Sequence, residues 1–105
     1  MSKMKETLIK AKELLSDPKH WGKLDYFPGE GSYCLLGACA VAAGVSKDEE
    51  SVEEFYASYR PGNKIIGLLK SHVPSIQCVA DYNDSVTTEH EDILALLDKA
   101  INELE

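Results

Sequence analysis

Three residues, Cys34, Asn83 and Asp84, are of types that could perform chemistry. Cys34 opens a nearly all-apolar segment over residues 34–44, and Asn83-Asp84 come just before the segment with the most regular helical spacing. If Ser32 caps a helix, Cys34 lies in its first turn, where the helix dipole and the free N–H groups stabilise a thiolate. The chain could therefore present a thiol nucleophile.

A thiol enzyme would also need a base and a group that orients the base. His72 or His90 could be the base, and Asn83 or Asp84 could orient it, as in the Cys, His and Asn set of papain-like enzymes. The residues around Cys34 match no signature of such a family. Free cysteine is often a small buried apolar residue, so we favour a structural role for Cys34. A thiol-dependent hydrolase or transferase is the alternative.

The Asn83-Asp84 pair also has two interpretations. Asn and Asp side chains commonly bond to nearby backbone N–H groups in turns. Alternatively, Asp84 faces a ligand in a groove, since polar groups that converge with aromatic side chains mark binding sites. The predicted ligand-binding residues are Trp21, Tyr26, Tyr82, Asn83 and Asp84.

A second candidate surface is an acidic patch that could bind a basic protein partner and speed association. It consists of Asp48, Glu49, Glu50, Glu53 and Glu54. Acidic residues near the start of a helix also stabilise that helix without any partner. We therefore expect the groove at Asp84, and not the acidic patch, to be the functional locus.

Composition excludes several classes of function. The net charge is −7, and the acidic excess lies in residues 41–105, which argues against binding of nucleic acid through its phosphates. No apolar segment reaches the ~18 residues that span a membrane. Three cysteines without paired spacing predict reduced thiols in a cytoplasmic protein. Without Cys-x-x-Cys or His-x-x-x-His pairs we expect no metal and no cofactor. A protein partner or a small ligand remains, and the oligomeric state is left open.

The elements that position these residues are predicted to be helices in one domain over residues 1–105. A length of 105 residues with 44% hydrophobic residues supports a single core. Apolar spacing predicts a first helix over 3–16. Ser32 as N-cap and Gly44 as stop predict a second helix over 33–43. This second helix is apolar all round, so we expect it at the centre of the domain.

The remaining elements are less regular until the last one. We predict a helix over 51–59, a short helix capped by Asn63, and a final helix over 88–104 capped by Thr88. Residues 76–82 fit a helix or a strand, and a helix is favoured because no other segment could pair with a strand. The aromatic-rich connection over 19–31 should fold onto the core. The fold class is thus an all-α compact bundle of about four to five helices around a buried central helix.

The position of Gly37 predicts a close helix contact. Glycine inside a helix costs about 1 kcal/mol relative to alanine, so a packing reason is expected there. The final helix is the element that we expect to cross the second helix at Gly37.

Several motifs resemble a family of small uncharacterised proteins of actinobacteria and their phages. They are Trp21, Cys34-x-x-Gly37-Ala38, Asn83-Asp84, Thr88 and the Leu-rich final helix. The family motifs read Cys-x-x-Gly-Ala, then Trp-Asn-Asp, then Arg-Thr, whereas this chain has Tyr82 for the Trp and Thr87 for the Arg. The resemblance implies one fold over most of the chain and no established activity. We expect a small non-catalytic binding protein, an accessory factor of a phage or mobile element.

Overall fold

The described part of the chain is built from helices around an apolar core, and it forms no strand. The computed structural model describes residues 3–23, 26–27, 31–57, 61–73, 78–85 and 87–104. Its α-helices are α1 (Lys3–Leu14), α2 (Leu35–Ala42), α3 (Glu49–Phe55), α4 (Pro61–Lys70), α5 (Val79–Asp84) and α6 (His90–Glu103). The all-α prediction is confirmed, with one helix more than the upper number expected.

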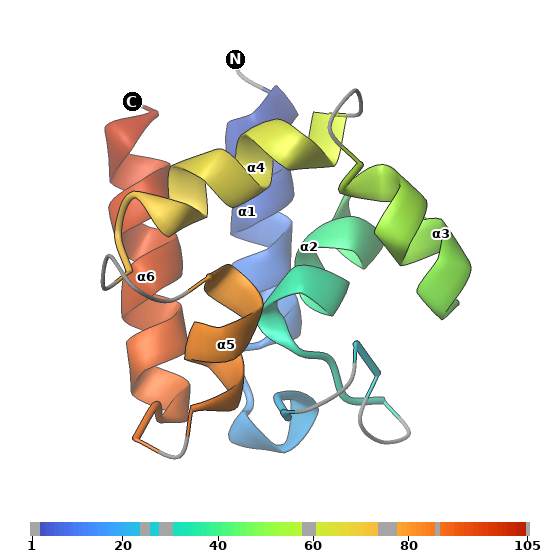
Figure 1. Ribbon diagram of the computed structural model, residues 1–105. Coiled ribbons are helices and arrows are strands. Elements are labelled where there is room, and N and C mark those ends of the chain that lie inside the picture. Colours follow the sequence, from blue (N-terminus) through green and yellow to red (C-terminus); the bar gives the residue numbers. More distant parts are fainter. Residues whose placement is uncertain are drawn as a thin grey trace.

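The central position predicted for the second helix is confirmed. Six of the eight residues of α2 are buried, from Leu35 to Ala40. Figure 1 shows α2 in the middle of the molecule, with α3 on one side and α6 on the other. The core also includes Leu8 of α1 and Leu97 of α6, both 0% exposed. The chain leaves α2 through Gly44, whose φ of 94° is readily adopted only by glycine.

The helices α1 and α6 lie side by side and antiparallel (Figure 1). Two polar contacts fix this pairing. Nζ of Lys12 lies 2.5 Å from Oδ1 of Asp98, and Nε2 of His90 donates to the carbonyl oxygen of Leu15 at 2.5 Å. No helix within the described residues is long and apolar enough to cross a membrane.

The connection between α1 and α2 folds back onto the core, as predicted for its described residues. It contains a short 3-10 helix, η1 (Pro18–His20). A single parallel bridge joins Trp21 to Tyr33: Tyr33 N donates to His20 O at 2.8 Å, and Gly22 N donates to Tyr33 O at 3.0 Å. The aromatic residues Trp21, Tyr26 and Phe27 pack partly buried against the core.

The predicted cap of the second helix is wrong, and this bridge explains why. Tyr33 is held extended by its bridge, so α2 begins two residues later than predicted. The N-cap is Cys34, whose Sγ accepts from Gly37 N at 3.3 Å. Ser32 instead donates its hydroxyl to the carbonyl of Lys19 at 3.0 Å.

The predicted cap of the final helix is also wrong, by one residue. Glu89 is the N-cap, and it forms a reciprocal capping box with Asp92. Thr88 is only 4% exposed, and its N–H donates to Ser85 O at 3.1 Å in the preceding turn. Thr88 therefore belongs to the turn that enters α6, and the helix begins after it.

The helix α1 ends at Leu14, two residues before the predicted end, and boundaries of α3, α4 and α5 also differ from the prediction. The helix α3 begins at Glu49 because Asp48 caps it, with Oδ1 accepting from Ser51 N at 2.8 Å. Proline suits the first position of a helix, so α4 begins at Pro61 and Asn63 lies within it. In the ambiguous segment, α5 is a helix from Val79 onward and extends to Asp84. The ends predicted at 58–59 and 76–77 lie outside the described residues.

Gly37 does have a close backbone neighbour, but it is not α6. A Cβ atom at residue 37 would collide with the carbonyl oxygen of Tyr26, in the connection that precedes α2. The same carbonyl oxygen accepts from Cys34 N at 3.0 Å. The absence of a side chain at Gly37 thus lets the connection lie directly on the first turn of α2.

We predict that Gly37→Ala lowers the free energy of unfolding by about 1–3 kcal/mol, the usual range for inserting a methyl group where no space exists. Gly67→Ala is the matched control, because Gly67 is a helical glycine of α4 and a Cβ atom added there would meet nothing within 4 Å. Alanine there should raise stability by roughly 0.5–1 kcal/mol. Urea denaturation of both variants measures the difference, and equal shifts in the same direction would refute the close contact.

Candidate functional site

The side chain of Asn83 joins three parts of the chain. It is 1% exposed, and its Oδ1 accepts from Nε1 of Trp21 at 2.7 Å and from the backbone N of Leu35 at 3.1 Å. Its Nδ2 donates to the carbonyl of Gly22 and to Oδ1 of Asp84, each at 3.1 Å. Both lone pairs and both N–H groups of the amide are therefore used. Asn83 fastens α5 to the start of α2 and to the connection before it.

Beside this amide a cavity of about 210 Å³ opens, between α3, α5 and the start of α2. Its lining residues come from both surfaces predicted from the sequence, together with the candidate thiol. They are Tyr26, Cys34, Glu49, Glu53, Ala80, Asn83 and Asp84. The structure thus merges part of the groove with part of the acidic patch.

The electrostatics of the cavity are negative. Glu49 and Glu53 are one helical turn apart on α3, and Asp84 lies at the end of α5. The pKa of the Tyr26 hydroxyl is raised, first by burial and then by the negative charge of Glu53, with further contributions from Cys34 and Glu49. Tyr26 therefore stays a neutral phenol in a region of negative potential.

The rest of the predicted groove lies outside the cavity. Trp21 supports Asn83 through its indole N–H, and Nζ of Lys23 lies 5.4 Å from the centre of the Trp21 ring. Lys23 also donates to the carbonyl of Ser85 at 2.5 Å. Tyr82 is half-buried, and its pKa is raised by burial and then by Asp92. Neither aromatic ring lines the cavity.

The acidic patch is divided in a similar way. Both carboxylate oxygens of Asp48 accept hydrogen bonds from Ser51: Oδ1 from its backbone N and Oδ2 from its hydroxyl, the latter at 2.9 Å. Glu50 and Glu54 are exposed and do not line the cavity, whereas Glu49 and Glu53 do. One face of α3 therefore belongs to the site and the other does not.

The three thiols have different environments. Cys34 is 7% exposed and caps α2 while it lines the cavity. Cys39 is 0% exposed, and burial, aided by Cys34, raises its pKa to about 12. Cys78 is exposed and caps α5, with Sγ accepting from Asp81 N at 3.4 Å. Cys39 is thus held as an inert thiol in the core.

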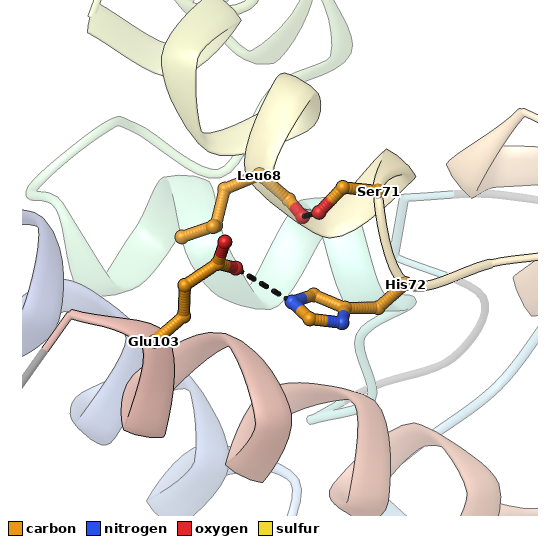
Figure 2. A network of polar contacts seen from close by, with 4 residues as sticks. All are labelled: Leu68, Ser71, His72 and Glu103. Atoms are coloured by element: carbon orange, nitrogen blue, oxygen red, sulfur yellow. Dashed lines mark hydrogen bonds and ion pairs between the residues drawn. The ribbon is translucent and has the colours of Figure 1, made fainter.

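The two histidines proposed as bases line no part of the cavity. His72 follows α4, and its Nε2 lies 2.7 Å from Oε2 of Glu103 on α6 (Figure 2). His90 begins α6, and its ring centre lies 6.1 Å from that of Trp21. The described residues also hold no group of three His, Cys, Asp or Glu side chains that could share a metal ion.

Ala80 and the convergence of Glu49 and Glu53 with Asp84 were not anticipated from the sequence. The spacing of Glu49 and Glu53 places both on one helix face, which is a local signal. The approach of α3 to α5 has no such signal, because more than 25 residues separate Glu53 from Ala80. Only the packing of both helices against α2 brings these residues together.

The sequence matches a family of unknown function, DUF6197, over residues 1–103. The chain belongs to this family. The match extends from before α1 to the end of α6, so it includes every residue of the cavity. The expectation of an uncharacterised family is confirmed at that level. No curated protein and no solved structure matches the chain.

For this member of DUF6197 we predict that Asn83→Ala lowers the free energy of unfolding by at least about 2 kcal/mol. The change leaves the indole N–H of Trp21 and the backbone N–H of Leu35 without an acceptor, and each buried unsatisfied donor costs about 1–3 kcal/mol. Asn102→Ala is the control, since Asn102 is exposed on α6 and surface changes usually fall within about 0.5 kcal/mol. Thermal unfolding followed by circular dichroism compares the two, and a silent Asn83→Ala would show that the amide is not a structural centre.

Proposed function

We propose that this protein is a non-catalytic binding protein that engages a partner or ligand at the cavity between α3 and α5. The observation that carries the proposal is the composition of the lining. Tyr26, Asn83 and Asp84 share one cavity with Glu49 and Glu53. An aromatic ring beside convergent polar groups in a concave site is the usual composition of a recognition site.

The floor of the cavity is well suited to recognition. Asn83 is held by four hydrogen bonds. Cys34 is held by two, since its N–H donates to Tyr26 O and its Sγ accepts from Gly37 N. Groups that are fixed before binding lose little conformational entropy when a ligand arrives. A preformed floor therefore favours binding at this place.

A role as an accessory factor of a phage or mobile element is the biological setting that we propose. It is supported by the resemblance to small proteins of actinobacteria and their phages, which the motifs Cys34-x-x-Gly37-Ala38 and Asn83-Asp84 carry. In the structure Cys34 caps α2 and Asn83 joins α5 to α2, so the motifs account for the fold and not for a reaction.

A thiol-dependent hydrolase or transferase remains the second candidate, because Cys34 lines the cavity. Its sulfur already accepts the N–H of Gly37 as a helix cap. His72 and His90, the bases that such an enzyme would need, lie at other places in the fold. The geometry thus favours binding over thiol chemistry.

Thiol labelling separates the two candidates. With iodoacetamide at pH 8, we expect Cys78 to react first, Cys34 more slowly and Cys39 only on unfolding, because access and thiolate formation both limit alkylation. Peptide mapping by mass spectrometry gives the three rates, and labelling in denaturant provides the control in which they converge. A Cys34 that reacts faster than the exposed Cys78 would favour the thiol enzyme.

Filling the cavity tests the binding function. Ala80→Trp places a large ring in the lining, and Ala95→Trp is the control because Ala95 is an exposed helical alanine of α6 outside the cavity. We expect at least one protein or small molecule to co-purify with the wild type and with Ala95→Trp but to be depleted about tenfold with Ala80→Trp, a loss of about 1.4 kcal/mol. Quantitative mass spectrometry of material purified from the native host measures this. Identical recoveries for both variants would rule out the cavity as the binding site.

A further inference from the structure

We infer that the cavity receives an arginine side chain of a protein partner. This inference rests on the proposed function and deepens it by naming the class of occupant. Its basis is the sign of the charges in the lining, the size of the cavity, and the acidic surface that continues beyond it.

The charged side chains among the described lining residues are all acidic. Glu49 and Glu53 enter from α3 and Asp84 from α5, and no basic side chain is among the described residues that line the cavity. A concave site lined by one sign of charge concentrates its potential and raises the local concentration of the opposite charge. The pKa of Tyr26 is raised first by burial, and the negative charge of Glu53 adds to the shift. The occupant is therefore a cation.

The volume of the cavity limits the size of the part of a ligand that can enter it. A volume of about 210 Å³ falls below the roughly 300–1,000 Å³ of pockets that enclose drug-sized ligands. One long side chain fits such a space, whereas a larger ligand would stay mostly outside it.

The chemistry of the walls fits a guanidinium group. Carboxylates on two different helices face one space, and a planar fork with five N–H donors can bond to more than one of them. A guanidinium also stacks on aromatic faces, and Tyr26 supplies a neutral ring in the lining. Asn83 has already used its hydrogen-bonding groups and contributes shape alone.

The surface around the cavity indicates a protein and not a free small cation. Asp48, which caps α3, and Glu50 and Glu54, which lie on α3, are exposed and do not line the cavity. A small cation that filled the cavity would not use these charges. A protein with a basic surface around the inserted side chain would be steered by them.

The test compares two peptides of the same shape in ¹H–¹⁵N NMR titrations of the wild type. One is acetyl-Gly-Gly-Arg-Gly-Gly-amide, and the other has citrulline, the neutral analogue, in place of arginine. We expect the arginine peptide to shift the amide signals of Glu53, Ala80 and Asp84, and to bind at least about tenfold more tightly than the citrulline peptide, as charge-assisted hydrogen bonds require.

Paired variants check that the cavity is responsible. Glu49→Gln with Glu53→Gln should weaken the arginine peptide about tenfold, since charge-assisted bonds are about twice as strong as neutral ones. Glu50→Gln with Glu54→Gln removes the same charge from the same helix, and it should change binding less than about twofold because neither carboxylate lines the cavity and their more distant charges are screened by salt. Melting temperatures confirm that both variants are folded.

Four results would overturn the inference. The first two are equal binding of the two peptides and equal weakening by the two variant pairs. The others are absence of any binding by the arginine peptide, and binding of agmatine, the free amine that carries the same guanidinium group, tenfold more tightly than that peptide. If Ala80→Trp nonetheless depletes a co-purifying molecule, the binding function stands and only the arginine occupant is wrong. If neither experiment gives a signal, both fail.

Discussion

The buried amide of Asn83 is the interaction on which the arrangement of the domain depends. Because α2 contains no charged residue, no ion pair from its own side chains can fix its position relative to the neighbouring helices. Apolar packing alone tolerates several arrangements of similar stability. The bond from Leu35 N to Asn83 selects one of them by tying the first residue of α2 to α5. The bonds to Trp21 and Gly22 then tie the preceding connection to the same point.

The site inherits its geometry from this network. Two of the lining residues, Asn83 and Asp84, belong to this network. A third, Cys34, directly precedes Leu35, whose N–H donates to Asn83. The opposite wall is formed by α3, which is attached to α2 near the core through Tyr56, whose hydroxyl donates to Leu36 O at 2.5 Å. One wall is therefore fixed by an amide, the other by a phenol, and both are fastened to the same helix.

Much of the fold could be predicted from the sequence, because it follows from local pattern. The apolar stripes of α1 and α6 and the uncharged surface of α2 are properties of single segments. The start of α2 was harder to predict, since it is decided by a contact with a residue well outside the helix. Ser32 has the better capping side chain, yet the bridge at Tyr33 keeps the chain extended and gives the cap to Cys34. The site was predicted in halves for the same reason: Asp84 and Glu53 have no local signal that they meet.

The contact at Gly37 has a consequence for how this fold can change. The backbone of Tyr26 is positioned by its carbonyl oxygen, which lies on Gly37 and accepts from Cys34 N, and none of these contacts involves the phenol ring. Main-chain atoms therefore set the outline of that wall, while the side chain at position 26 supplies its chemical character. The ring also packs against the core, so its size belongs to the scaffold and its hydroxyl to the surface of the cavity. A substitution that keeps a ring of similar size would change the chemistry of the wall and leave the path of the chain as it is.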